Sequence, residues 1–179
     1  VPTTIGVSTD KACLSESVYG ASKYLMERVF MNSNNNNGSK FSLTRFANVA
    51  HSNGSVLPFW LKLKKERKPL KLTDPKMNRL IFSKDDAASL INRTIDFTQK
   101  YGGGFVKSYK MKCVNMLDLA KVISDDIEIV GKRPGEKRDE DLISEREISR
   151  TFIYDDDIHI KAEHNTGVNR LFEPYNSAS

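Results

Sequence analysis

The chain has 179 residues, of which 39% are hydrophobic and 28% are charged, and its formal net charge is +5. These values are typical of a soluble globular protein of one domain, or of one domain and part of another. No apolar run reaches the roughly 18–20 residues of a membrane span, and we therefore expect no membrane insertion. The basic residues come without an arginine-rich arm or interleaved aromatic residues, which argues against nucleic acid as a partner. Cys13 and Cys113 lack metal-ligand spacing, so we expect reduced thiols and a cytoplasmic location.

The first chemically informative stretch spans residues 4–11, where Thr-Ile-Gly-Val is followed by Ser-Thr-Asp-Lys. The small and β-branched residues predict the end of a buried parallel strand. A helical pattern then covers residues 17–31, in which Tyr19, Lys23 and Glu27 recur every four residues and share one face. An ammonium group beside a phenol favours the phenolate, which would suit Tyr19 to proton transfer near neutral pH.

The later elements follow in chain order. A strand over residues 41–49 is expected to end at the ligand-binding edge of the sheet. The remaining predicted elements are a helix over 56–65 with Trp60 in the core, a strand at 70–72, a helix capped by Ser83, a last sheet strand from Phe105, a helix over 116–123 capped by Asn115, a strand at 127–130, and short strands at 151–154 and 158–160. The acidic residues 155–157 lack the spacing of a calcium loop, and no metal site is expected.

Two segments carry a family resemblance: Val7 to Ala12, and Val18 to Lys23. They resemble the extended short-chain dehydrogenase/reductases, and among these the UDP-N-acetylglucosamine 4,6-dehydratases of nucleotide-sugar and surface-glycan synthesis. Those enzymes carry Ser-Thr-Asp-Lys-Ala nine residues before the catalytic tyrosine, and the step from Asp10 to Tyr19 matches. The resemblance continues to about Leu142.

The resemblance implies an α/β fold: the C-terminal part of a Rossmann-type parallel-sheet domain, with a smaller α+β substrate-binding domain. The expected bounds are 1–49 and 80–108 for the Rossmann-like part, and 50–79 and 109–175 for the substrate-binding part. No Gly-x-Gly-x-x-Gly sequence occurs in the chain. We therefore expect the N-terminal cofactor half to be absent, either because the sequence is a fragment or because a partner chain supplies that half.

The resemblance also implies a reaction and its catalytic residues. The expected cofactor is NADP, with NAD less favoured, contacted by Ser8, Tyr19 and Lys23. Tyr19 would deprotonate the sugar 4-hydroxyl during oxidation at C4, while Lys23 holds the phenol and the nicotinamide ribose. Lys11 would remove the C5 proton, and Asp10 would protonate the C6 hydroxyl so that it leaves as water. Desolvation beside Lys23 would help Lys11 act as a base, and burial would help Asp10 act as an acid.

The expected partner is UDP-N-acetylglucosamine or a related UDP-sugar. The implied substrate contacts are Thr9, Asn48, Ser55, Val56, Thr73, Met77, Arg79, Arg133 and Glu136. A guanidinium group can bind phosphate oxygens through a bidentate fork, which suits Arg79 and Arg133 to the diphosphate. Two departures from the family pattern, Ala47 in place of Gly and Asn53 in place of Arg, leave one contact near the diphosphate open.

One position bears on the subtype. Related membrane-anchored dehydratases that retain the C5 configuration tend to have Met where this chain has Tyr19, which favours a C5-inverting enzyme. The alternatives are another extended UDP-sugar epimerase or dehydratase of the same fold, and a UDP-sugar-binding fragment without activity. The Asp10-Lys11 pair distinguishes a dehydratase from a simple 4-epimerase, because a 4-epimerase needs no acid and base for dehydration. A homo-oligomer is expected.

Overall fold

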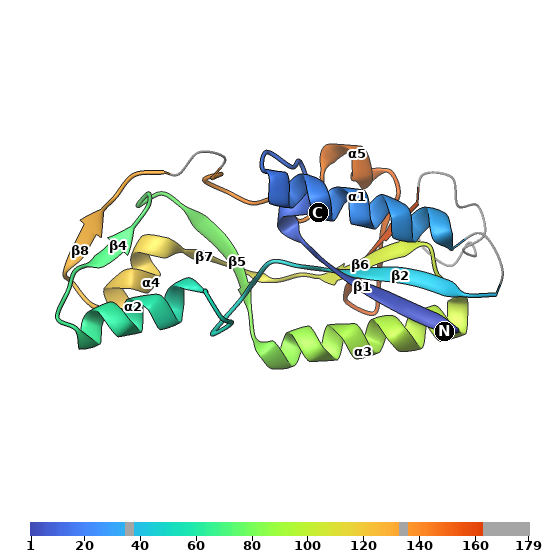
Figure 1. Cartoon of the computed structure of the whole chain (residues 1–179), viewed down its shortest axis with the longest axis horizontal. Helices are drawn as coiled ribbons and strands as arrows, with labels where there is room; N and C mark the ends of the chain where they lie inside the picture. Colours follow the sequence, from blue (N-terminus) through green and yellow to red (C-terminus); the bar gives the residue numbers. More distant parts are fainter. Residues whose placement is uncertain (35–37, 133–135, 163–179) are drawn as a thin grey trace. The chain divides into compact units, whose positions relative to one another are not determined.

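The computed structural model describes residues 1–34, 38–132 and 136–162, which divide into two compact units (Figure 1). The first unit contains residues 1–46, 88–110 and the described part of the chain from 141 onward. The second unit contains residues 47–87 and 111–140. The chain therefore passes between the units four times, and each unit is built from segments distant in sequence.

The first unit is organised around a five-stranded sheet. Its strands, in spatial order, are β1 (Thr3–Thr9), β2 (Lys40–Phe46), β6 (Phe105–Tyr109), β10 (Asp157–Lys161) and β9 (Thr151–Tyr154). β1, β2 and β6 run parallel, whereas β10 is antiparallel to both β6 and β9. The predicted α/β class and the parallel character of the first strand are confirmed.

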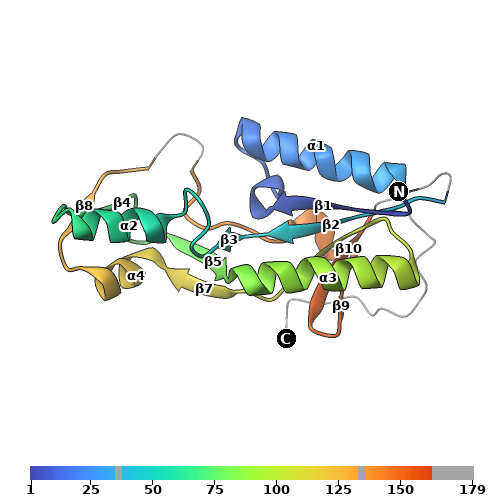
Figure 2. The same cartoon turned by 60° about the horizontal axis from the view of Figure 1, so that its bottom comes forward.

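Helices cover both faces of this sheet, as Figures 1 and 2 show for α1 (Val18–Ser33) and for α3 (Lys84–Tyr101). Since side chains alternate between the faces of a strand, each strand contributes to both helix–sheet interfaces. The apolar cluster beside α1 is formed by Met31, Leu43, Val106, Ile158 and Ile160.

The C-terminal segment corrects two sequence predictions. We expected residues 109–175 to belong to the substrate-binding part, and the strand from Phe105 to be the last of the sheet. Instead, β10 pairs with β6 and carries β9 beside it, so residues 141–162 belong to the first unit. The reason is the alternation in β10, where Ile158 and Ile160 complete the apolar cluster beside α1.

The opposite face of β6 and β10 holds a buried polar cluster. Lys107 Nζ lies 2.9 Å from Asp157 Oδ2, and Arg93 Nη2 lies 2.8 Å from Asp157 Oδ1. The His159 ring is buried beside them, with its centroid 4.4 Å from that of Phe97. Burial, helped by the positive charge of Lys107, lowers the pKa of His159 to about 3. The folded protein therefore holds this imidazole neutral.

Acid is expected to destabilise the first unit through His159. Because the pKa of His159 is about 3 when folded and about 6.5 when unfolded, the unfolded chain binds more protons between these pH values. Stability therefore falls as pH is lowered through this window, by up to about 1.4 kcal/mol per pH unit from this group. Urea unfolding from pH 7 to pH 4 should show a shallower pH dependence for His159→Gln than for the wild type. An equal slope for both proteins would contradict the assignment.

In the described residues, the second unit has two small sheets, two complete helices and the first residues of α3. The first sheet has the order β3 (Asn48–Val49), β5 (Asn78–Phe82) and β7 (Lys112–Asn115), the second pairs β4 (Leu70–Leu72) with β8 (Ile127–Ile129), and the helices are α2 (Val56–Lys65) and α4 (Met116–Ile123). Its core contains Trp60, Leu63, Leu70, Leu72, Met77, Met116 and Ala120. The predictions of Trp60 as a core residue and of Asn115 as the α4 cap are confirmed.

Several boundaries differ from the sequence predictions. The predicted strand over 41–49 is two strands, because β2 pairs with β1 in the first unit whereas β3 pairs with β5 in the second. β7 and the short helix α5 (Glu145–Ile148) were not predicted. Ser83 does cap α3, since its hydroxyl accepts a hydrogen bond of 3.0 Å from the Asp86 amide.

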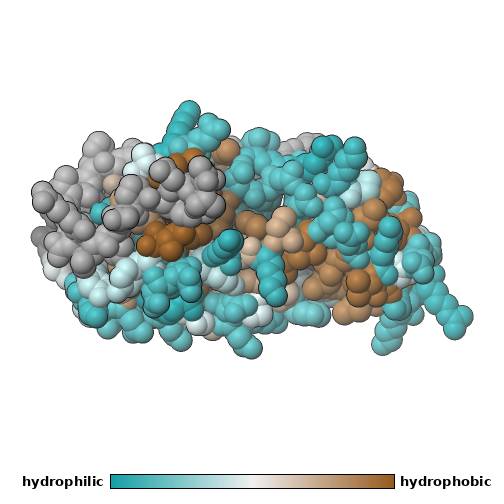
Figure 3. All heavy atoms as spheres, turned by 180° about the vertical axis from the view of Figure 1, so that it is seen from behind, coloured by the Kyte–Doolittle hydropathy of each residue, from teal (hydrophilic) through white to brown (hydrophobic). Residues whose placement is uncertain are grey.

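Polar side chains cover most of the face shown in Figure 3, and apolar side chains form patches between them. The large apolar side chains exposed in the described residues include Val18, Leu25 and Val29 of α1 and Val122 of α4. A mixed surface of this kind is ordinary for a folded chain. Within the described ranges, no helix is long and apolar enough to cross a membrane.

Candidate active site

The end of β1 brings an acid and an amine together. The short helix η1 (Asp10–Ala12) begins directly after β1, and the Thr9 hydroxyl caps it by accepting from the Lys11 amide. Lys11 Nζ lies 3.2 Å from Asp10 Oδ1, which also accepts a 2.8 Å hydrogen bond from the Thr9 hydroxyl. The Asp10 side chain is 0% exposed, and its Oδ2 accepts no hydrogen bond from any described residue. One carboxylate oxygen is therefore left for a further donor.

The first two turns of α1 place the phenol and the second amine. The helix begins after Ser17, whose hydroxyl accepts a 3.0 Å hydrogen bond from the Gly20 amide. Tyr19 is 55% exposed, and Lys23 Nζ lies 6.0 Å from the centroid of its ring. Lys23 Nζ also donates to the Val7 carbonyl at 3.0 Å, which fixes the amine at the C-terminal end of β1.

Gly20 lets these two pairs approach each other. A Cβ atom at this position would lie 2.3 Å from the carbonyl oxygen of Lys11. The backbone of α1 therefore lies directly against η1, with no room for a side chain. This contact joins the Asp10–Lys11 pair to the Tyr19–Lys23 pair at one end of the sheet.

Gly20→Ala is expected to destabilise the protein by about 1–3 kcal/mol, because the added methyl group must push α1 away from a backbone oxygen. Alanine in a helix interior normally stabilises a protein by about 0.5–1 kcal/mol relative to glycine. A loss of stability in Gly20→Ala would therefore itself indicate the close contact. Ser22→Ala, at an exposed position of the same helix, is the matched control and should change stability by less than about 0.5 kcal/mol. Urea unfolding measures both, and a stabilised Gly20→Ala protein would refute the close contact.

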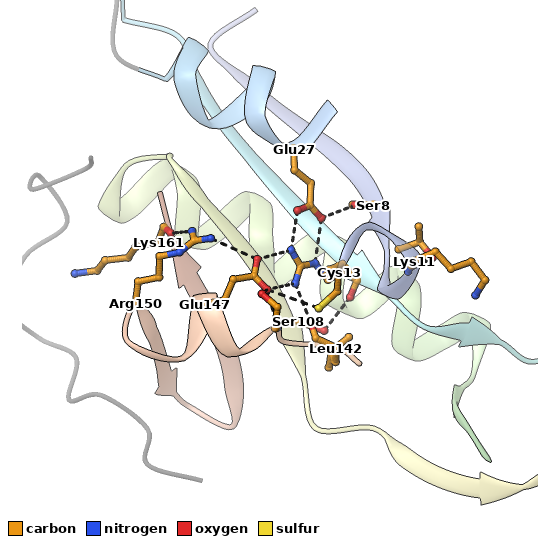
Figure 4. Close-up of polar contacts among 12 residues, drawn as sticks. Ser8, Lys11, Cys13, Glu27, Ser108, Leu142, Glu147, Arg150 and Lys161 are labelled. Carbon is orange, nitrogen blue, oxygen red and sulfur yellow. Dashed lines mark hydrogen bonds and ion pairs between the residues drawn. The ribbon is translucent and has the colours of Figure 1, made fainter. Parts of the chain in front are cut away.

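A buried ionic network begins at Glu27, one helical turn after Lys23. The Ser8 hydroxyl donates to Glu27 Oε1 at 2.6 Å, and Glu27 accepts from Arg45 through both carboxylate oxygens, at 3.0 and 2.7 Å. Glu147 of α5 accepts from the same guanidinium at 3.0 and 2.8 Å. In Figure 4, Glu27 and Glu147 reach toward the same point from opposite sides, whereas Lys11 extends away from the network.

The Arg45 guanidinium uses all five of its N–H donors. Four go to the two carboxylates and the fifth goes to the Leu142 carbonyl at 2.8 Å. Burial alone would lower the pKa of Arg45, but the two carboxylates outweigh it and raise that pKa further above its ordinary value. Conversely, burial tends to raise the pKa of Glu147, and the hydrogen bonds and charge of Arg45 bring it down to about 2. The neighbouring Cys13 thiol has a pKa raised to about 12, chiefly by burial.

The second unit holds most of the predicted substrate contacts, and Arg79 has a clear structural task there. Its Nη1 donates to the carbonyls of Asn78 and Arg138 at 2.8 Å each, and its Nη2 donates to the Lys137 carbonyl at 3.0 Å. Glu136 Oε1 lies 3.7 Å from Nη2. Arg79 lies on β5 and therefore binds residues 136–138, which follow the Arg-Pro-Gly sequence, to that strand. A contact with a diphosphate stays a prediction, as does one for Glu136.

The other predicted substrate contacts differ in burial. Asn48 Nδ2 donates to the Leu80 carbonyl at 3.1 Å, and Met77 packs into the core of the second unit. Ser55 is the N-cap residue of α2, but its hydroxyl makes no capping hydrogen bond and is buried with no hydrogen-bond partner among the described residues. Val56 packs against the same core, and Thr73 is half-buried after β4. Arg133 lies outside the described residues.

Sequence reasoning assigned no role to Glu27, Arg45 or Glu147. Two signals were available: Glu27 continues the four-residue spacing of Tyr19 and Lys23, and Arg45 is a charged residue inside a strand of apolar and hydroxyl residues. A buried charge needs a partner, so Arg45 indicated an ion pair without identifying it. Nothing in the sequence indicated Glu147, which is 102 residues away. The structure also gives the Ser8 hydroxyl an internal partner, and its contact with a cofactor stays a prediction.

The fold and the strand-end residues define a class. A parallel strand that ends in Ser-Thr, a short helix that begins with Asp-Lys, and a Tyr-x-x-x-Lys helix packed on the sheet form the arrangement of the extended short-chain dehydrogenase/reductases. The family model described as "Polysaccharide biosynthesis protein" matches residues 1–162, and the chain belongs to this family.

Individual relatives agree with this family. The UDP-N-acetylglucosamine 4,6-dehydratase (inverting) of Campylobacter jejuni is 34% identical over 157 residues, covering 84% of this chain and 46% of the relative. The UDP-glucose 4-epimerase of Rickettsia bellii is 31% identical over 159 residues, covering 84% and 46%. The crystal structure of Pen from Bacillus thuringiensis superposes with a TM-score of 0.84 at 27% identity, covering 96% of this chain and 56% of that one. The chain spans about half the length of the curated relatives it matches.

Proposed function

We propose that this chain carries the catalytic residues of a UDP-N-acetylglucosamine 4,6-dehydratase that inverts the configuration at C5, with NADP as cofactor. The product would be a UDP-4-keto-6-deoxy-N-acetylhexosamine for glycan synthesis. The similarity to the inverting dehydratase of Campylobacter jejuni supports the choice of substrate. The sequence holds no glycine-rich dinucleotide loop, so we propose that residues outside these 179 supply that loop.

The observation that carries the proposal is the contact between Asp10 and Lys11. Loss of water from a 4-ketosugar needs a base at C5 and an acid at the C6 hydroxyl. Lys11 Nζ lies 3.2 Å from Asp10 Oδ1, so one substrate carbon chain can reach both groups. The elimination uses Lys11 as the amine base and Asp10 as the carboxylic acid. The Asp10 side chain is fully buried, and 38% of the Lys11 side chain is exposed.

The residues beside β1 suit the nicotinamide end of a cofactor. Lys23 donates one of its three N–H groups to the Val7 carbonyl, and the other two can donate to ribose hydroxyls. The exposed Tyr19 phenol is open to a substrate hydroxyl. A nicotinamide held there would accept hydride from sugar C4 and return it to C6. The preference for NADP over NAD rests on the family resemblance.

Each step assigns one proton to one residue. The Tyr19 phenolate takes the proton of the 4-hydroxyl as C4 is oxidised to the ketone. The ketone acidifies the C5 proton, which the neutral amine of Lys11 removes. The carboxylic acid of Asp10 donates its proton to the C6 hydroxyl, which leaves as water and forms an alkene between C5 and C6. The Asp10–Lys11 pair therefore ends the elimination with the same number of protons as it began. Addition of hydride at C6 would leave an enolate, which takes one solvent-derived proton at C5. Inversion requires this proton to arrive on the face opposite the one from which Lys11 removed the first.

Proton NMR of the full-length protein with UDP-N-acetylglucosamine and NADP tests the proposal. The expected product has a new C6 methyl signal, a ketone or hydrate at C4, and inverted configuration at C5. Retention at C5 would refute the inverting assignment. A sugar that keeps its C6 hydroxyl and changes only at C4 would refute dehydration altogether.

The similarity to a UDP-glucose 4-epimerase supports a second candidate, an epimerase of the same fold. The same NMR spectra separate the two, since only dehydration produces a methyl group. The third candidate is a chain that binds UDP-sugar without turnover. Separate calorimetric titrations of residues 1–179 with UDP and with NADP would test it, and binding of UDP alone would support it.

A further inference from the structure

Two consecutive residues of β1 are tied to two side chains of α1 that lie one helical turn apart. The Val7 carbonyl accepts from Lys23, and the Ser8 hydroxyl donates to Glu27. Successive strand residues face opposite ways, while residues four apart on a helix share a face. The first contact is made at the exposed edge of the helix and the second in the buried interior. Together they fix both the rotation of α1 and its position along β1.

Of the two contacts, the one made by Glu27 is the stiffer. Its carboxylate receives three hydrogen bonds, one from Ser8 and two from Arg45, and the side chain is only 2% exposed. The Arg45 guanidinium is itself held in place by Glu147 and by the Leu142 carbonyl. A buried, bidentate pair of this kind has one well-defined geometry. The exposed ammonium of Lys23 has no comparable constraint of its own.

We infer that Glu27 is a positioning residue for the Tyr19–Lys23 pair. It anchors the third turn of α1 to β1 and β2. Lys23 then stays within reach of the Val7 carbonyl, and Tyr19 stays at the end of the sheet where the Asp10–Lys11 pair lies. Its effect on turnover rests on the function proposed above. Its effect on the geometry of Lys23 does not.

Two matched variants separate positioning from simple stability. Glu27→Gln and Glu147→Gln each remove one carboxylate from the same guanidinium, but only Glu27 lies on α1. Glu147→Gln should lose at least as much thermal stability as Glu27→Gln, because Glu147 also accepts from the Ser144 amide and hydroxyl and pairs with Arg150. Only Glu27→Gln should loosen the first turns of α1.

The first readout needs no cofactor or substrate. Acetylation of lysine amines by a sulfonated N-hydroxysuccinimide ester, followed by mass spectrometry, reports the accessibility of each amine. Lys23 should be modified several-fold faster in Glu27→Gln than in the wild type, and amides of residues 18–23 should exchange faster with deuterium. Glu147→Gln should leave both rates at Lys23 and in this segment unchanged. Glu27→Asp, which keeps the charge, should recover part of the protection.

The second readout uses turnover of UDP-N-acetylglucosamine. Glu27→Gln should lower kcat about tenfold or more with little change in KM, because catalytic geometry changes and substrate contacts do not. Glu147→Gln should lower kcat much less, because it leaves both hydrogen bonds from Arg45 to Glu27 in place. Equal labelling and equal exchange in the two variants would overturn the inference, even if the wild type proves inactive on this sugar. If Glu27→Gln does not fold, Ser8→Ala removes only the bond to β1, and an unchanged Lys23 labelling rate in that variant would also overturn it.

Discussion

Arg45→Met is expected to lower the free energy of unfolding by about 3–5 kcal/mol, the usual loss when one partner of a buried ion pair is removed. Arg45 is 1% exposed, and its removal leaves Glu27 buried without its cation and the Leu142 carbonyl without its donor. Glu147 would keep only Arg150, whose Nη2 lies 3.5 Å from Glu147 Oε1. Arg45→Lys should also be costly, because an ammonium group has three donors where the site uses five.

Urea unfolding of Arg45→Met at pH 7 measures this loss, with Lys68→Met as the control. Lys68 pairs with Glu66 at 2.8 Å on the surface, and removal of an exposed pair costs less than about 1 kcal/mol. The difference in the free energy of unfolding between wild type and Arg45→Met should shrink as pH falls from about 4.5 toward 2. The reason is that Arg45 stabilises Glu147 only while Glu147 is ionised. A pH-independent difference, or a loss no larger than that of the control, would count against the network.

The local part of the candidate site could be predicted from the sequence because it depends on neighbours along the chain. A strand, a capped turn and a helix with four-residue spacing place Asp10, Lys11, Tyr19 and Lys23 within one short segment. Helix caps at Ser83 and Asn115 were predictable for the same reason, since their bonds span two or three residues. Short-range rules of this kind hold whatever the rest of the chain does.

The non-local part could not be predicted, and the reasons differ between elements. Residues 41–49 form a continuous run of strand-forming residues, and only the choice of partners divides the run into β2 and β3. β10 joins the first unit because Ile158 and Ile160 pack in the cluster that contains Leu43, and the alternation in β10 does not by itself identify that partner. Glu147 meets Arg45 across 102 residues. In each case tertiary packing decides what local propensity leaves open.

Lys11→Met is expected to reduce formation of the dehydrated product by about 10²–10⁴-fold, the usual contribution of a general base. The physical reason is specific to the second half of the reaction. Lys11 is the amine beside Asp10, whereas Tyr19, the proposed base for oxidation at C4, lies on α1 with Lys23 Nζ 6.0 Å from its ring centroid. Loss of Lys11 should therefore stop removal of the C5 proton while leaving formation of the 4-ketone in place. Tyr19→Phe should stop both.

Exchange of the C5 proton in deuterated water distinguishes these variants, and trapping with borodeuteride detects the 4-ketone. Lys11→Met should yield trapped ketone without deuterium at C5. Asp10→Asn, in which the base remains and the acid is lost, should yield ketone with deuterium at C5 but little product, because the C6 hydroxyl is no longer protonated. Tyr19→Phe should yield none of the three signals. If Lys11→Met still incorporates deuterium at C5 at the wild-type rate, the base is another residue, and the contact between Asp10 and Lys11 serves the structure rather than the elimination.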